Sequence, residues 1–412
     1  MEMEMELKLH VKVVINKEKT KVLFAEADSN FADVLLSFLL LPLGTIVRVL
    51  EKHYRRKAPV IGSLTTLYKG ATNLNFIYFE GEHAKNHIIS STHFETEFCK
   101  LGLNICGTHP TSSSSGKSND GVFIKSTARC IISDDLRVLP IVTGSIIETL
   151  SSLGIAVEDM DGTETRNVAS GLNEIKALLK ESLISTNPLT SLIFPGRRQM
   201  ILATDRHVFL SRIDENAILR NTKRMILKVM LQKSTNMLLF AQADSDFVNF
   251  LFANLTISLG RVEWFLGSDS GLKSIDNLHR SVADDSNNIR VKDSYTKDLL
   301  IKPKPTDHTY SCSENEYCFL NFNRHMSYGY VDGAIMYMVS DDLTVAPLGV
   351  TSGLSIINEL KISLSDIKEV KMQVGLEEGL SILKAALTST TALTDGLIKP
   401  FLKKQEREQQ LQ

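Results

Sequence analysis

The sequence repeats itself, and this duplication constrains the fold more than any other feature. Leu23–Gly44 aligns with Leu239–Gly260 at an offset of 216, with 11 identical residues in 22 positions. Two later motifs recur in the same order, SDDL from Ser133 at an offset of 207 and the segment from Gly171 at 204. These offsets far exceed the roughly 20–50 residues of a solenoid repeat. They predict two tandem homologous domains, not a repeat array.

The matches also predict where each unit begins and ends in the 412-residue chain. We expect the first copy of the repeat domain at 1–193, a connector at 194–222 and the second copy at 223–400. The connector has no counterpart after the second copy, so we assign it to neither. Residues 401–412 form a short polar C-terminal tail.

Hydrophobic patterning predicts the opening elements of each copy. Apolar residues alternate over 7–15, which is typical of a half-buried strand, and a polar loop leads to a second strand at 21–27. Asp28 offers an N-cap oxygen to a helix whose apolar face includes Phe31 and Val34. We expect Leu43–Gly44 to end this helix, and Leu259–Gly260 to end its counterpart.

A second strand pair flanks each SDDL motif, at 122–132 with 137–142 and at 331–339 with 344–350. Helical patterns follow at 145–153 and 172–183, and again at 352–360 and 376–387. Strand–helix–strand crossovers do not dominate this order. The predicted fold class is therefore α+β, with antiparallel β-hairpins and packed helices in each of two tandem homologous domains.

Composition excludes several classes of protein. Lys and Arg total 46 against 48 Asp and Glu, so a net charge of −2 makes nucleic acid an unlikely partner. No apolar run approaches the roughly 20 residues of a membrane-spanning helix, so no membrane association is expected. The N-terminus lacks a signal-peptide pattern and the five Cys are an odd number, which predicts reduced thiols and a cytoplasmic or nuclear location.

Two clusters of Cys and His are the candidate metal sites. The first contains His83, His87, His93, Cys99, Cys106 and His109. The second contains His308, Cys312, Cys318 and His325. Their spacings match neither each other nor a standard zinc finger or ribbon. No cofactor is therefore predicted, and structural zinc remains the alternative.

Other polar motifs each have a structural and a chemical interpretation. Asp134–Asp135 and Asp341–Asp342 suit either an Asx-type turn or acid/base and Mg²⁺ chemistry, and we favour the turn. Cys130 lies on an apolar strand face, which favours core packing over a nucleophile. The Ser-rich loop at 112–118 lacks the first Gly of a phosphate-binding loop, which favours a flexible loop. Trp264 is expected to pack.

The opening segment at 23–50, GSLTTLYKGATNL at 62–74, the SDDL-x-V-x-P turns and the closing segments to Thr190 and Thr394 are together similar to a plant family known as domain of unknown function 674. The resemblance covers nearly the whole chain apart from the connector. It implies two tandem copies of that domain and a plant origin. It implies no activity, cofactor or catalytic residue.

The residues that the copies share are apolar, turn-forming or capping, which favours a non-enzymatic intracellular scaffold or protein-interaction module. Its partner would be protein, with the divergent loops 105–120 and 300–330 as recognition surfaces. The alternative is a small-ligand-binding protein or an enzyme with its site between the two domains. For that alternative, the candidate anion contacts are His53, Tyr54, Arg55 and Arg56. The oligomeric state is left open.

Overall fold

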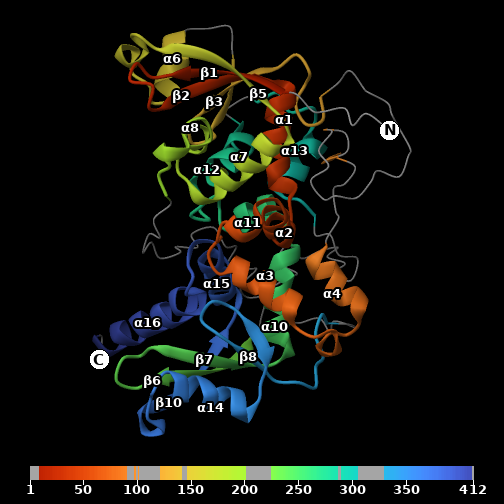
Figure 1. Ribbon diagram of the computed structural model, residues 1–412, viewed down its shortest axis with the longest axis vertical. Coiled ribbons are helices and arrows are strands. Elements are labelled where there is room, and N and C mark those ends of the chain that lie inside the picture. Colours follow the sequence, from red (N-terminus) through yellow and green to blue (C-terminus); the bar gives the residue numbers. More distant parts are fainter. Residues whose placement is uncertain are drawn as a thin grey trace.

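The computed structural model describes residues 9–90, 97–98, 101, 121–141, 146–200, 224–285, 289–304 and 329–410. Two five-stranded antiparallel sheets lie at opposite ends of the molecule, with most helices between them (Figure 1). This arrangement confirms the predicted α+β class. Within the described ranges, no helix has the length and apolarity needed to cross a bilayer.

The two sheets have the same strand order. The first is β4-β3-β2-β1-β5, made of β1 (Leu9–Ile15), β2 (Val22–Asp28), β3 (Arg129–Ser133), β4 (Val138–Pro140) and β5 (Glu164–Ser170). The second is β10-β6-β7-β8-β9, made of β6 (Met225–Gln232), β7 (Leu238–Ala243), β8 (Tyr337–Val339), β9 (Val345–Pro347) and β10 (Ile367–Val374). Strands that the sequence offsets align therefore occupy the same places.

Four of the five strands in each sheet match the predicted hairpins, although β3, β4, β8 and β9 are shorter than expected. The fifth strands, β5 and β10, were not predicted. Both are edge strands, and they carry charged and polar side chains along much of their length. Charged and polar residues are common on edge strands, and they weaken the apolar alternation that identifies a strand.

The predicted N-caps are present in both halves. The Asp28 carboxylate accepts a hydrogen bond from the Phe31 N–H at 3.0 Å and begins α1 (Ser29–Ser37). Asp244 does the same at 3.2 Å for α10 (Ser245–Thr256). A side-chain acceptor here satisfies one of the free N–H groups of a first helical turn.

The predicted ends of these two helices are wrong. Leu43 and Leu259 instead begin the next helices, α2 (Leu43–Tyr54) and α11 (Leu259–Phe265). Gly44 is needed for close approach and not for a helix end, because a Cβ there would lie 3.0 Å from the Leu255 carbonyl oxygen. Glycine tolerates such contact with a neighbouring backbone.

Most of the helices predicted late in each half are present. The structure also contains helices in the middle of each half that the sequence patterns did not predict. The first half contains α3 (Leu64–Asn73), α4 (Glu82–Ile89), α6 (Ile146–Ser152), α7 (Leu172–Ile184) and α8 (Pro188–Ile193). The second half contains α12 (Lys273–Ala283), α13 (Ser294–Ile301), α14 (Val350–Glu359), α15 (Leu376–Thr388) and α16 (Lys399–Gln410). A π-helical turn at Thr394–Ile398 precedes α16.

The two halves exchange helices. Helix α3, from the first half, packs against α10 and β9 of the second half. Helix α12, from the second half, packs against α7 and β4 of the first. Figure 1 shows the orange α3 near the second sheet and the teal α12 near the first. Each half therefore supplies part of the helical layer that covers the other half's sheet.

Reciprocal backbone hydrogen bonds join the halves where the chain crosses over. The Leu43 N–H donates to the Ile257 oxygen at 2.9 Å, and the Leu259 N–H donates to the Leu41 oxygen at 2.9 Å. The offset of 216 relates these two bonds to each other. Isolated bridges at Phe79–Val331 and Ile124–Val291 form a second related pair.

One continuous apolar core spans both halves. It includes buried residues from strands of both sheets, such as Val13 and Val229, and from the exchanged helices, such as Leu67 and Leu278. A smaller cluster lies on the outer face of the first sheet, where Leu150 and Leu153 at the end of α6 pack near Phe24. Because the main core is shared, neither half buries its apolar surface alone.

Candidate functional site

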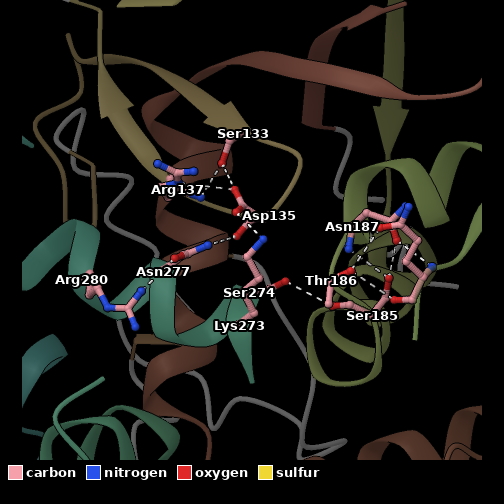
Figure 2. A network of polar contacts seen from close by, with 11 residues as sticks. Ser133, Asp135, Arg137, Ser185, Thr186, Asn187, Lys273, Ser274, Asn277 and Arg280 are labelled. Atoms are coloured by element: carbon pink, nitrogen blue, oxygen red, sulfur yellow. Dashed lines mark hydrogen bonds and ion pairs between the residues drawn. The ribbon is translucent and has the colours of Figure 1, made fainter. Parts of the chain in front are cut away.

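The SDDL motif forms the β3–β4 turn, and the structure shows that its two Asp residues have different roles. The Ser133 hydroxyl donates to Asp135 at 2.6 Å, and the Arg137 N–H donates back to the Ser133 hydroxyl at 2.8 Å (Figure 2). In the second half, Ser340 donates to Asp342 at 2.5 Å. The position of the predicted turn is therefore confirmed in both halves, and in the second half Asp342 also accepts from the Thr344 N–H at 3.1 Å, as an Asx-type turn requires.

The first Asp of each pair instead holds a later helix of its own half. Asp134 accepts from the Thr190 N–H at 2.8 Å and from the Thr190 hydroxyl at 2.6 Å. Asp341 accepts from the Thr394 N–H at 2.8 Å and its hydroxyl at 2.7 Å. Two acceptor bonds to one threonine fix the start of the closing helices, which is a structural use of a carboxylate.

A buried leucine completes each turn in a strained conformation. Leu136 and Leu343 have φ of 61° and 64°, in the left-handed region that favours glycine. Both side chains are fully buried. Packing in the core outweighs the local strain, which is typically about 1–2 kcal/mol for such a residue.

The same turn also receives the exchanged helix. The Asn277 amide on α12 donates to the Asp135 carbonyl oxygen at 3.0 Å (Figure 2). At the equivalent place in the other half, the Thr66 hydroxyl on α3 donates to the Asp342 carbonyl oxygen. The SDDL turn is therefore the point at which each sheet, its closing helix and the exchanged helix are joined.

A second contact repeats this relation. The Ser274 hydroxyl of α12 donates to the Ser185 carbonyl oxygen at 3.3 Å, and the Ser63 hydroxyl donates to the Ser389 carbonyl oxygen at 2.7 Å. Ser185 and Ser389 follow α7 and α15 directly. Each hydroxyl thus satisfies a carbonyl at a helix end, where intrahelical partners are missing.

Charged side chains surround the SDDL turn of the first half. The Asp135 carboxylate lies 3.2 Å from the Lys273 ammonium and 3.6 Å from Arg137 Nε. Burial alone would raise the pKa of Asp135, but the Ser133 hydrogen bond and the positive charges of Arg137 and Lys273 outweigh it and lower that pKa. This carboxylate is held ionised.

A buried polar cluster lies behind this turn, between α11 and α12. Asp276 accepts from both the N–H and the hydroxyl of Ser270, each at 2.8 Å. Ser268 Oγ lies 2.8 Å from His279 Nδ1, and His279 Nε2 lies 3.0 Å from the Ile301 carbonyl oxygen. A carbonyl only accepts, so Nε2 carries the proton and a neutral ring accepts from Ser268. Burial lowers the pKa of His279, which favours that neutral form.

Glu263 is the most deeply buried acid of this cluster. Its side chain is fully inaccessible, and neither carboxyl oxygen has a hydrogen-bond partner at normal distance among the described residues. Burial, followed by the negative charge of Asp276, raises the pKa of Glu263 well above its usual value. The positive charge of Arg280 opposes this shift but does not outweigh burial, so the protonated form of the carboxyl group is favoured.

Replacing Glu263 with Gln should remove a pH dependence of stability. The folded protein retains a proton that the unfolded chain releases above about pH 4.5, so wild-type stability falls as pH rises. The slope reaches at most about 1.4 kcal/mol per pH unit. Urea unfolding between about pH 5 and pH 8 should show the wild type losing stability relative to Glu263→Gln. Glu377→Gln, at an exposed position, is the control, and parallel curves for wild type and Glu263→Gln would contradict the expectation.

The first half has different residues at the positions of this cluster. The offsets of 216 and 211 place Val47, Thr65 and Tyr68 at the positions of Glu263, Asp276 and His279. The cluster was not among the sequence-based candidates, because its residues are dispersed along two helices and match no motif. Comparison of the two copies through this stretch would have identified it.

Another polar position shared by the halves holds a loop. Asp33 accepts from the N–H groups of Val122, Phe123 and Ile124 at 2.6–3.1 Å. Its counterpart Asn249 accepts from the N–H groups of Tyr330 and Val331. Burial raises the pKa of Asp33 to about 6 although the three N–H groups oppose that change. The residue acts as a structural acceptor.

The candidate metal sites fall mostly outside the described residues. His308, Cys312, Cys318 and His325 all lie there, as do His93, Cys99, Cys106 and His109. His83 and His87 are on α4, where the His87 ring stacks on Tyr330. Among the described residues, no group of three or more His, Cys, Asp or Glu is arranged to hold a metal ion. The zinc alternative stays a prediction.

The other sequence candidates have definite places. Cys130 is buried, and burial raises the pKa of its thiol to about 12, in agreement with core packing. Trp264 is half-buried between Arg261 and Lys302. His53, Tyr54, Arg55 and Arg56 lie at the end of α2, where Lys180 lies over the Tyr54 ring. The whole of loop 105–120, which includes 112–118, and most of loop 300–330 lie outside the described residues.

Comparison with known proteins places the chain in a family. A family model described as Protein of unknown function (DUF674) matches residues 5–113, 91–328 and 321–412. No match was found among curated proteins or among solved structures. The three matched segments together span almost the entire sequence. The chain therefore belongs to the family of unknown function DUF674.

Proposed function

We propose that the protein is a non-enzymatic scaffold that binds apolar protein segments at both ends of its intertwined body. The observation that supports this is a set of exposed apolar side chains at equivalent positions of the two halves. Ile147 and Leu354, related by the offset of 207, are 61% and 43% exposed. Val157 and Leu364, related by the same offset, are 50% and 66% exposed.

Single exposed apolar residues are common and need no explanation. Exposed apolar residues at two pairs of equivalent positions do need an explanation. The two halves have diverged, since only half of the aligned positions are identical even in the best-matching segment. The residues lie on α6 and α14 and on the short helices after them, Val157–Met160 and Leu364–Asp366. These elements lie at the two ends of the molecule (Figure 1). Two similar surfaces on a rigid body suit a bivalent scaffold.

The shared polar residues fit the same function. Asp134 and Asp341, Asp33 and Asn249, and Ser63 and Ser274 all make hydrogen bonds that hold the fold together. Both halves therefore retain the residues that hold the fold together and the exposed apolar residues at the ends of the molecule. A protein partner would contact those ends through an apolar or amphipathic segment.

Affinity purification from native tissue, with substitutions at each end, tests this function. Wild-type protein should capture partners that Ile147→Ser/Val157→Ser and Leu354→Ser/Leu364→Ser each capture less well. The quadruple variant should lose them. Ile226→Ser is the control, because Ile226 is also exposed but its counterpart is His10. Undiminished capture of the same partners by the quadruple variant would sink the proposal.

A second candidate function is a small-ligand site at the α11–α12 cluster, close to the boundary between the halves. The observation in its favour is that buried polar side chains gather there, whereas the first half has Val47, Thr65 and Tyr68 at the positions of Glu263, Asp276 and His279. Thermal-shift screening of metabolites and nucleotides tests it. A ligand of this cluster should stabilise the wild type and lose its effect on His279→Tyr, which introduces the residue of the first half. Equal shifts in both proteins would exclude the cluster.

A further inference from the structure

The outer edge of β10 carries a row of backbone groups with which no strand among the described residues pairs. β10 is the terminal strand of the second sheet, and β6 is its neighbour on one side. Among the described residues, no strand pairs with its other side. The side chains of Glu369, Lys371 and Gln373 are exposed. A free edge of eight residues is long enough to accept another strand.

The register of the sheet determines which residues face outward along this edge. The Lys233 N–H donates to the Asp366 oxygen at 2.7 Å, and the β10–β6 register places these two residues opposite each other. Hydrogen-bonded and non-hydrogen-bonded pairs alternate along an antiparallel ladder. The backbone groups of even-numbered residues therefore face β6. Those of Ile367, Glu369, Lys371 and Gln373 point away from the sheet.

The charges along the edge are complementary to those of a second copy in one antiparallel register. With Val370 opposite the Val370 of the other copy, Glu369 faces Lys371 and Lys371 faces Glu369. Every outward-facing residue from 367 to 373 then meets an outward-facing partner. The two neighbouring registers that keep this match place either Glu369 opposite Glu369 or Lys371 opposite Lys371. Like charges directly opposite each other are destabilising, so charge selects the first register.

We propose that β10 pairs antiparallel with β10 of a second copy of this chain, joining the second sheets of two molecules into one continuous sheet. Backbone hydrogen bonds supply affinity, and the two Glu369–Lys371 pairs fix the register. This pairing uses the backbone groups of a strand edge, whereas the proposed partner binding uses apolar side chains, of which Leu364 lies just before β10.

The equivalent edge strand of the first half, β5, does not have charges that are complementary to those of a second copy. The offset of 204 places Thr165 and Asn167 where β10 has Glu369 and Lys371. It also places Arg166 at the position of Val370, so self-pairing of β5 would bring two Arg166 side chains together. Within its own chain, Arg166 lies 2.5 Å from Glu164, whereas Glu369 of β10 has a longer ion pair of 3.8 Å with Lys228 of β6. Association through one edge only gives a closed dimer and not a filament.

Charge-reversal variants of the full chain test the proposal. Wild type should sediment as a dimer whose dissociation is favoured by dilution and by salt. Glu369→Lys and Lys371→Glu should each weaken the dimer about tenfold or more, because each change sets like charges opposite each other twice. The double variant, with the charges exchanged, should regain dimerisation.

Mixing supplies the decisive experiment. Glu369→Lys presents two lysines and Lys371→Glu presents two glutamates, so the two variants should form a mixed dimer at a concentration at which each variant alone is monomeric. Circular dichroism melts establish that both are folded, and Thr165→Lys on β5 is the control that should remain dimeric. A monomeric wild type at high concentration, dimeric single variants, or no association on mixing would each overturn the proposal.

Discussion

Two fragments made by opening the chain between residues 200 and 224 are expected to assemble into one folded complex. The reason is the exchange of helices, because α3 packs on the second half and α12 packs on the first. The continuous core contains residues from both fragments. When co-expressed, the fragments should co-purify in equal amounts. Their melting temperature should rise with concentration, as it does for any folded state that requires association.

Each fragment made alone should behave differently. Without its partner, the fragment 1–200 lacks α12 over its sheet and exposes the faces of α2 and α3 that contact the second half. It should precipitate, or pair with itself through the same reciprocal contacts, and never form a stable folded monomer. Sedimentation and circular dichroism distinguish these outcomes. A monomeric first half that unfolds cooperatively would show that the exchange does not hold the halves together.

The sequence predicted the parts of this fold that depend on local pattern. The hairpins β1–β2 and β6–β7, the Asp28 and Asp244 caps and the helices after Gly171 and Gly375 all follow from short-range signals. In each case the determining residues lie within one turn or one strand of the element. Duplication strengthened these predictions because each pattern occurs twice.

The exchange itself could not be predicted in this way. Leu43–Gly44 has the composition of a helix end, yet it begins α2, because the chain crosses to the other half at Pro42 and continues there. Whether a helix packs on its own sheet or on a related one depends on contacts between distant residues. Because the two halves have similar surfaces, a helix can pack on either sheet, and the local sequence pattern does not distinguish these two arrangements.

Contacts between distant residues also limited how much of the candidate site could be predicted from the sequence. Asp134 and Asp135 were assigned together to a turn, but only Asp135 serves it, while Asp134 holds Thr190 more than 50 residues later. The cluster of Glu263, Asp276 and His279 matches no motif and was missed. Function in a family without known chemistry must therefore be argued from such contacts, which only the folded chain brings together.

Gly260→Ala should destabilise the protein, although glycine-to-alanine changes within helices ordinarily stabilise by about 0.5–1 kcal/mol. Gly260 is in the first turn of α11 at the crossing of the two halves. A Cβ there would lie 2.6 Å from the Leu300 carbonyl oxygen and 3.0 Å from the Leu39 carbonyl oxygen. Both contacts are with backbone, so relief requires movement of neighbouring segments. We expect a loss of about 1–3 kcal/mol in the free energy of unfolding, as for overpacked cores.

The same substitution at two other glycines tests how strongly stability depends on the close contacts where the two halves cross. Gly44 is the counterpart of Gly260, with its nearest contact at 3.0 Å, and should lose less stability on the same change. An alanine methyl at Gly196 would meet no atom within 4 Å, so this change should alter stability by less than about 0.5 kcal/mol. Urea unfolding of the three variants should give the order Gly260→Ala, Gly44→Ala, Gly196→Ala in loss of stability. If Gly260→Ala were as stable as wild type, the close approach of α11 to Leu300 of α13 and to Leu39 of the first half would be wrong. Because Gly44 and Gly260 each contact backbone of the opposite half, the same substitutions should also weaken assembly of the split fragments.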